Sequence, residues 1–133
     1  MTDCLCDEGH TGTITDPTDT CDACAAGSYK TGTGDGVCED CPADSDTASD
    51  GSTAIEDCLC DAGYTGTIAD PADTCEACGA AEYKEDAGPA ACDDCPANSD
   101  SAPASTAVTA CECDAGYSGI IEDTCECHAS LTQ

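Results

Sequence analysis

The hydrophobic and polar residues of this chain follow neither of the two periods that define regular secondary structure. No stretch of about twelve residues carries apolar side chains at a spacing of three to four, so the pattern predicts no α-helix. Short apolar pieces at 12–15, 67–69 and 119–122 favour small strands, separated by Asp-Pro and Gly-Asp-Gly turns. Residues 44–57 and 98–110 are rich in Ser, Thr, Ala and Asp and are expected to be loops. The pattern therefore predicts a small-β fold of short antiparallel hairpins with little regular secondary structure.

The composition explains what must hold such hairpins together. Ile, Leu and Val total only ten residues in 133, and Phe and Trp are absent, whereas 16 residues are Cys. Ten aliphatic side chains bury too little apolar area to offset the backbone entropy of a chain this long. Cysteine at this frequency indicates a disulfide scaffold, which is typical of proteins outside the cell. The fold class expected is therefore small and disulfide-rich, and the expected location is extracellular or at the cell surface.

The cysteines recur with a fixed period. They occur in C-x-C and C-x-x-C pairs, and the distance from Cys4 to Cys58 is 54 residues, while that from Cys58 to Cys111 is 53. The sequence between them recurs as well, because CLCDEGHTGTITDPTDTCDAC at 4–24 returns as CLCDAGYTGTIADPADTCEAC at 58–78. A shorter version closes the chain at 111–127. These repeats predict a tandem array of similar modules.

One repeat, residues 24–75, resembles the cysteine-rich, EGF-like repeat of ephrin-receptor ectodomains. The second copy, 78–125, departs from the pattern at Ala81, where the first copy has Gly27, and it lacks Asp-Pro before its last cysteine. The resemblance implies an extracellular spacer or interaction module, and it implies neither a kinase nor ephrin binding. The matching positions of the first copy are Cys24, Gly27, Tyr29, Lys30, Gly34, Asp35, Cys38, Cys41, Pro42, Ser45, Thr47, Gly51, Cys58, Cys60, Gly63, Tyr64, Asp70, Pro71 and Cys75.

The resemblance also implies module boundaries and a disulfide order. The modules expected are a truncated EGF-like module at 1–23, full modules at 24–77 and 78–127, and a tail at 128–133. The EGF-like order joins the first cysteine to the third, the second to the fourth and the fifth to the sixth. From sequence alone six cysteines allow 15 connectivities, so the first four in each module are not fixed. The implied pairs are Cys6–Cys21, Cys24–Cys41, Cys38–Cys58, Cys60–Cys75, Cys78–Cys95, Cys92–Cys111 and Cys113–Cys125.

Two cysteines, Cys4 and Cys127, are left over by this order. Cys4 occupies a fourth-cysteine position and Cys127 a first-cysteine position, so each needs a partner beyond the neighbouring modules. The chain could be a fragment of a longer array, which the lack of a signal peptide after Met1 also favours. Alternatively, Cys127 of one subunit could lie near Cys4 of the next and join chains head to tail, which would give an open filament. An internal Cys4–Cys127 bridge is the third alternative.

The charge of the chain excludes several functions. Two Lys, no Arg and 29 acidic residues give a net charge of −27, so the chain cannot neutralise a phosphate track or bind an anionic membrane. No apolar run approaches the length of a membrane span. Acidic clusters such as Asp16–Asp19 lack an EF-hand pattern, so we expect no specific cofactor, although loosely bound Ca²⁺ is compatible with this surface. His10 and His128 are the only histidines and no motif places them in a catalytic arrangement, so we expect no enzyme.

A thiolate metal site is the main alternative use of the cysteines. Cys21-x-x-Cys24 and Cys38-x-x-Cys41 lie 13 residues apart, as do Cys75-x-x-Cys78 and Cys92-x-x-Cys95. Two such knuckles can form a tetrahedral zinc site. The interleaved C-x-C pairs argue against this alternative, because a four-thiolate site in each module would leave two cysteines unused.

The Ser- and Thr-rich loops are candidates for O-linked glycans. The chain has one Asn, Asn98, and it lies outside any N-x-Ser/Thr acceptor. The O-glycosylation candidates are Thr47, Thr53, Ser101, Ser105, Thr106 and Thr109.

Together these features predict an extracellular structural repeat protein that forms a rod, a filament or a cell-surface appendage through stacked disulfide-bonded modules. The expected partners are further copies of the chain, joined head to tail, with glycans as further candidates. The alternatives are an adhesion or receptor ectodomain fragment that binds a protein or glycan, and a thiolate metal-binding protein.

Overall fold

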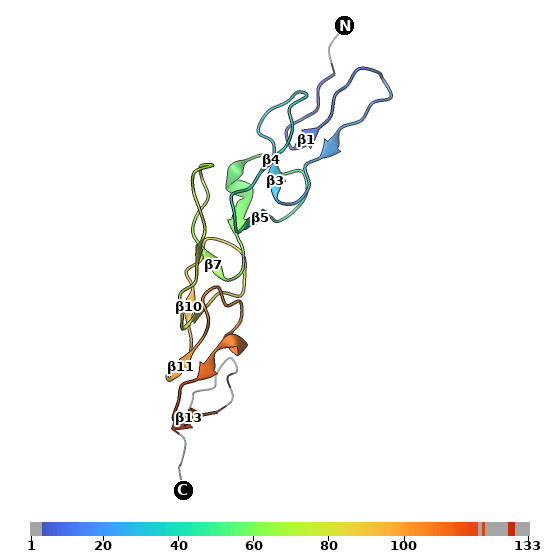
Figure 1. The fold of residues 1–133 in the computed structure, drawn as a ribbon. Coiled ribbons are helices and arrows are strands. Elements are labelled where there is room, and N and C mark those ends of the chain that lie inside the picture. The colour runs from blue at the N-terminus through green and yellow to red at the C-terminus, as the bar shows by residue number, and fades with distance from the viewer. Residues whose placement is uncertain (1–3, 120, 122–127, 130–133) are drawn as a thin grey trace. The chain divides into compact units, whose positions relative to one another are not determined.

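The computed structural model describes residues 4–119, 121 and 128–129, and in this part of the chain every strand belongs to a two-stranded sheet (Figure 1). Two single-turn 3-10 helices, η1 (Ile55–Asp57) and η2 (Val108–Ala110), are the helical elements of the described residues. The strand pairs are β1 (His10–Thr11) with β2 (Asp22–Ala23), β3 (Ser28–Tyr29) with β4 (Glu39–Asp40), β5 (Ser45–Thr47) with β6 (Cys58–Cys60), β7 (Tyr64–Thr65) with β8 (Glu76–Ala77), β9 (Glu82–Tyr83) with β10 (Asp93–Asp94), β11 (Ser99–Asp100) with β12 (Glu112–Cys113), and β13 (Tyr117–Ser118) with β14 (His128–Ala129). Small disulfide-rich modules built from two-stranded hairpins, repeated in tandem along the chain, are therefore the observed fold.

The predicted strand positions at 12–15 and 67–69 were wrong by a few residues. The chain is extended in β1 and β7, which end before Gly12 and Gly66. These glycines have φ angles of +145° and +139°, which L side chains rarely adopt, so the strands end there. The isoleucines that suggested strands lie in the following loops, where Ile68 is buried. Of the third predicted strand, 119–122, residues 120 and 122 lie outside the described part, and Gly119 follows β13.

The predicted loops at 44–57 and 98–110 contain short regular elements. Strands β5 and β11 lie in them, followed by η1 and η2. Each 3-10 turn buries one branched aliphatic side chain, Ile55 in the first copy and Val108 in the second. Their Ser- and Thr-rich composition concealed the strands, because strands of two or three residues carry too little periodicity to be recognised.

The chain divides into two compact units. The first contains residues 1–59 and 67–75, and the second contains 60–66 and 76–133. Each unit contains a C-D-x-G segment, Cys6–Gly9 in the first and Cys60–Gly63 in the second, together with the Tyr-Lys pair that follows it in sequence. The module boundaries drawn from the resemblance, at 23, 77 and 127, stay predictions.

The interior of each unit is built from sulfur rather than from hydrocarbon. The largest fully buried side chains are all cysteines: Cys6, Cys24 and Cys58 in the first unit and Cys60 and Cys78 in the second. Few aliphatic side chains join them, chiefly Ile55 and Ile68 in the first unit and Val108 in the second. Among the described residues no helix has the length and apolar character needed to cross a membrane.

Candidate functional site

The disulfide bonds of the structure join neighbouring cysteines, and the EGF-like order expected for the first four cysteines of each module was wrong. The resemblance implied Cys24–Cys41 and Cys38–Cys58 in the first full module. In the structure the first cysteine of each full module is bonded to the second, and the third cysteine is bonded to the fourth. In each bonded pair the Cα atoms lie 5.6–5.8 Å apart, within the range that a disulfide spans. Each bridge closes a local excursion of 14 to 17 residues and contributes about 3 kcal/mol in the chain-entropy model. The bridges are Cys6–Cys21, Cys24–Cys38, Cys41–Cys58, Cys78–Cys92 and Cys95–Cys111.

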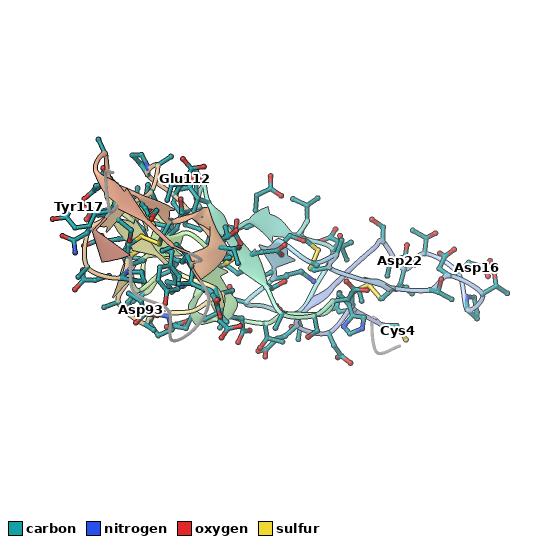
Figure 2. All side chains as sticks on the ribbon, turned by 90° about the horizontal axis from the view of Figure 1, so that it is seen from below. Cys4, Asp16, Asp22, Asp93, Glu112 and Tyr117 are labelled. Atoms are coloured by element: carbon teal, nitrogen blue, oxygen red, sulfur yellow. A yellow bond between two sulfur atoms is a disulfide. The ribbon has the colours of Figure 1, made fainter. Side chains whose placement is uncertain are left out.

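The remaining cysteines differ in state. Cys60, Cys75 and Cys113 are disulfide-bonded. Cys4 has a free thiol and is exposed (Figure 2). The expected Cys113–Cys125 bridge and the candidate junction residue Cys127 involve positions outside the described residues.

The pairing changes two sequence-based hypotheses. Every thiol of the four C-x-x-C knuckles is bonded to another sulfur, so these cysteines are not available as thiolate ligands in this structure. Under the observed order a fourth cysteine pairs with a third, and a first with a second. Cys4 and Cys127 are a fourth and a first cysteine, so the repeat pattern does not make them partners of each other.

A set of five backbone hydrogen bonds, which we call the clamp, holds the C-x-C-D-x-G segment against the rest of its unit. The set is the same in both copies, with donor-to-acceptor distances of 2.7–3.1 Å. Three of the five bonds involve the segment itself, two at its glycine and one at its second cysteine, and the other two join the residues that contact it. In the first copy the bonds run from the N–H of Gly9 to Lys30, Cys24 to Gly9, Gly51 to Cys24, Lys30 to Ser52 and Gly34 to Cys6. In the second they run from the N–H of Gly63 to Lys84, Cys78 to Gly63, Ala104 to Cys78, Lys84 to Ser105 and Gly88 to Cys60.

The only two cationic side chains of the protein lie inside these clamps. Lys30 is 6% exposed and Lys84 is 3% exposed, although lysine is rarely buried. The Nζ of Lys30 donates to the carbonyl oxygens of His10 at 2.6 Å and Gly34 at 2.7 Å, and that of Lys84 donates to the carbonyl of Gly88 at 2.8 Å. Both ammonium groups therefore bind main-chain carbonyl groups of the turns around them.

Sequence reasoning did not assign these lysines a role. The signal was present, because the only two cations of a chain with charge −27 occupy the same position of successive repeats, each directly after a tyrosine. A charge kept at the same internal position twice indicates a structural function, since a lysine needed only for solubility would lie at the surface.

Tyr29 packs next to the first lysine and is itself 3% exposed. Its hydroxyl group donates a hydrogen bond of 3.1 Å to Oε2 of Glu39 across the β3–β4 hairpin. Burial of the ring raises the pKa of Tyr29, and the hydrogen bond and negative charge of Glu39 raise it further. The phenol therefore keeps its proton and its hydrogen bond over an extended alkaline range.

The acidic cluster at Asp16–Asp19, a candidate for loose Ca²⁺ binding, forms a hydrogen-bonded turn. Oδ2 of Asp19 accepts hydrogen bonds from the N–H and Oγ1 of Thr15 and from the N–H of Asp16, and Oδ1 of Asp16 accepts from the N–H and Oγ1 of Thr18. These donors lower the pKa of both carboxyl groups, the amide donors most strongly. Among the described residues, no group of three or more His, Cys, Asp or Glu side chains is placed to hold a metal ion.

The candidate glycosylation residues fall into two groups. Thr47 and Ser101 stay predictions, but both are buried and their hydroxyl groups donate to the carbonyls of Ser49 and Glu82. Ser105 is half-buried and its hydroxyl donates to the carbonyl of Ala102. Thr53, Thr106 and Thr109 are exposed, so these three positions remain open to modification.

Comparison with known proteins connects this architecture to a family. Residues 12–58 match the family described as tyrosine-protein kinase ephrin type A/B receptor-like. No curated protein matches the chain. The matched family is a cysteine-rich repeat without a catalytic domain, typical of extracellular regions. The matched segment contains the Cys24–Cys38 and Cys41–Cys58 bridges, Lys30 and two of the five hydrogen bonds of its clamp. The chain therefore carries an ephrin-receptor-like cysteine-rich repeat within a series of small disulfide-bonded modules.

Proposed function

We propose that this protein is an extracellular structural protein whose interlocked modules form part of a rod, a filament or a cell-surface appendage. The observation that carries the proposal is the clamp. It fixes a segment of the chain against the Tyr-Lys segment that follows it, with the same five hydrogen bonds in both copies. Disulfide bonds and the hydrogen bonds of the buried lysines stabilise the same interior. The modules are therefore held by covalent bonds and by hydrogen bonds to the main chain rather than by a deformable apolar core.

The surface supports the proposal. Carboxylate side chains such as Asp16, Asp22, Asp93 and Glu112 project outward along the ribbon (Figure 2), and all four are exposed. Because both cations are used inside, the surface is almost uniformly negative, which keeps a long assembly solvated and resists sideways aggregation.

The third copy of the C-x-C-D-x-G segment supports end-to-end association. Gly9 and Gly63 are buried by their clamps, whereas Gly116 is exposed and would have no heavy atom within 4 Å of an added Cβ. Tyr117 is 38% exposed, while Tyr64 at the equivalent place is half-buried. Within the described residues, the segment is thus covered in its first two copies and uncovered in its third, which supports association of the third copy with a further repeat.

Small-angle X-ray scattering tests the proposed stiffness. The Debye length falls from about 30 Å at 0.01 M salt to about 10 Å at 0.1 M. If clamps and bridges stiffen the chain, its maximum dimension stays constant across this range, because charge repulsion does not set its length. Contraction with salt would contradict the proposal, and sedimentation at increasing concentration tests the end-to-end association separately. Reduced and alkylated chain, which lacks the bridges, is the control that should contract.

A further inference from the structure

The stretch Cys4-Leu5-Cys6 has the same sequence as Cys58-Leu59-Cys60 but a different environment. In the second stretch the residues form β6, which pairs with β5, and Cys58 is bonded to Cys41. Leu59 is half-buried beside a cavity of about 360 Å³ lined by residues of 48–57. Within the described residues, Cys4–Cys6 belongs to no strand pair, Leu5 is 56% exposed, and Cys4 carries a free thiol.

A third stretch shows that the pairing is a rule of the repeat. In Cys111-Glu112-Cys113 the last two residues form β12, which pairs with β11 in the register Ser99 with Cys113 and Asp100 with Glu112. Cys111 is bonded to Cys95. In both paired copies, the strand that adds to C-x-C therefore comes from the sequence Cys-Pro-Ala-(Asp or Asn)-Ser-Asp, and its cysteine bonds the first cysteine of C-x-C.

The incoming segment has the same local conformation in both copies. The hydroxyl group of its serine donates to the carbonyl of its proline at 2.6 Å, in Ser45 to Pro42 and in Ser99 to Pro96. The residue before the serine has a positive φ, 59° at Asp44 and 61° at Asn98. Asp and Asn adopt this conformation more readily than other non-glycine residues, so the short sequence itself favours the shape that binds.

The stretch that would receive this segment is already fixed at one end. Cys6 is fully buried, bonded to Cys21, and its carbonyl accepts the clamp hydrogen bond from Gly34. Cys60 holds the equivalent clamp bond, from Gly88. The stretch Cys4–Cys6 lacks the added strand that its counterparts have, and Cys4 lacks that strand's cysteine.

We propose that Cys4–Cys6 is a strand-addition site for a Cys-Pro-Ala-Asp-Ser-Asp segment of a further repeat, outside residues 1–133, which Cys4 then captures through a disulfide. The two such segments of this chain are already bonded to Cys58 and Cys111, so the occupant comes from a different repeat. Its serine lies opposite Cys6 and its following aspartate opposite Leu5, as in the register of β11 with β12. Strand addition supplies main-chain hydrogen bonds, and the cysteine supplies the covalent bond.

Capture proceeds by thiol–disulfide exchange. The thiolate of Cys4 attacks the sulfur of an incoming cysteine that is held as a mixed disulfide with a small thiol. The new Sγ–Sγ bond forms as the old one breaks, and the small thiol leaves with the electron pair and takes up the proton that Cys4 lost. No other oxidant is needed. The inference rests on the proposed function, because an array of disulfide-bonded modules outside the cell is the setting in which such exchange occurs.

The test uses the full oxidised chain and two peptides of identical composition. The matched peptide is Cys-Pro-Ala-Asp-Ser-Asp-Thr, the sequence of residues 41–47. In the control peptide Ser-Asp-Thr is moved in front of the cysteine. Its charge and its thiol are unchanged, but the strand-forming residues no longer come after the cysteine, so they cannot pair with Leu5 and Cys6 once the disulfide has formed. Both are offered as mixed disulfides in the presence of excess small thiol, and intact mass measures the fraction of chain captured at equilibrium.

We expect the matched peptide to be captured about threefold to tenfold more than the control, since a few cross-strand contacts contribute that much. The variant Leu5→Pro, which removes one main-chain donor, should abolish the preference while small thiol reagents still label Cys4. Equal capture of both peptides would overturn the proposal, as would the finding that Cys4 is bonded within its own chain. Capture does not depend on the stiffness or end-to-end association that scattering and sedimentation measure, so the two proposals can fail independently.

Discussion

Gly63 lies directly against the backbone of Ala104. A Cβ atom on residue 63 would be 2.5 Å from the carbonyl oxygen of Ala104, closer than real Cβ atoms come to another atom. The same contact recurs between Gly9 and Gly51 in the first unit. The C-x-C-D-x-G segment is therefore held at main-chain distance from its unit, where only glycine fits.

The variants Gly63→Ala and Gly116→Ala separate this contact from backbone strain. Both glycines have left-handed φ angles, +80° and +88°, so alanine costs about 1–2 kcal/mol at either position. At residue 63 the methyl group also collides with Ala104, whereas at residue 116 it meets open space. We expect Gly63→Ala to lower the free energy of unfolding of the second unit by at least about 2 kcal/mol more than Gly116→Ala does. Urea unfolding with the disulfides intact measures the difference, and equal losses would show that the clamp is not tight.

Trypsin should not cleave the oxidised chain. Its only two sites follow Lys30 and Lys84, whose side chains are buried and bonded to main-chain carbonyls. After reduction and alkylation the same treatment should yield fragments 1–30, 31–84 and 85–133, because the lysines are then exposed. A glutamate-specific protease, which has exposed sites such as Glu39, is the control for an active digestion. Cleavage of the oxidised and reduced chains at the same rate would contradict the burial of the lysines.

Digestion at glutamate also determines the disulfide order. The peptide 40–56 contains Cys41 alone, and cleavage after Glu39 and Glu56 releases it from its neighbours in sequence. The observed Cys41–Cys58 bridge should leave it joined to peptide 57–76. An EGF-like Cys24–Cys41 bridge would join it to peptide 9–39 instead. Mass spectrometry of the unreduced digest, kept acidic to prevent exchange, distinguishes the two outcomes.

The Asp16 turn should respond to the loss of one hydroxyl group. The N–H of Thr18 lowers the pKa of Asp16 most, and the Thr18 hydroxyl lowers it further. The second copy has Ala72 where this turn has Thr18, so Thr18→Ala is a natural substitution here. It should raise the pKa of Asp16 toward the usual value, but not fully, because the N–H of residue 18 remains. Carboxyl NMR titration measures the change, and Thr20→Ala is the control, since Thr20 makes no hydrogen bond to Asp16 in the structure.

The sign of this effect determines the pH dependence of the turn. A carboxyl group whose pKa is lowered by folding stabilises the folded turn above its ordinary pKa, and this contribution is lost as the pH falls through the lowered value. The amide signals of Thr15 and Thr18 should therefore lose their hydrogen-bonded shifts in acid. If they persist below the titration of both carboxyl groups, the carboxylates do not hold the turn.

Tyr29 provides the alkaline counterpart. Burial and Glu39 raise its pKa, so its contribution to stability is present below the ordinary tyrosine value and is lost as the pH rises through the raised one. The variant Glu39→Gln removes the negative charge and should lower the pKa of Tyr29, although burial keeps it raised. Ultraviolet titration of a chain in which Tyr64, Tyr83 and Tyr117 are replaced by Phe isolates this one phenol. An unchanged midpoint in Glu39→Gln would show that Glu39 does not contact the hydroxyl.

The sequence by itself determined the repeat, the dependence on sulfur and, for the part of the chain that the structure describes, the lack of α-helices. These follow from counts and spacings: ten aliphatic residues cannot form a core, and cysteines at a period of 54 and 53 residues specify recurring modules. The resemblance drawn from Tyr29, Lys30 and the cysteine spacing was confirmed by the match to residues 12–58.

Only the tertiary structure decided which cysteines pair and what the lysines do. All cysteines are chemically alike, and pairing depends on which Cα atoms come within about 6 Å after the hairpins form. The β3–β4 and β5–β6 hairpins place Cys24 near Cys38 and Cys41 near Cys58, a result that no spacing rule contains. Likewise Lys30 and Thr47 are buried beside groups from distant parts of the chain. The carbonyl of His10 accepts from Lys30 and the N–H of Gly27 donates to Thr47, which a linear pattern of polar residues does not reveal.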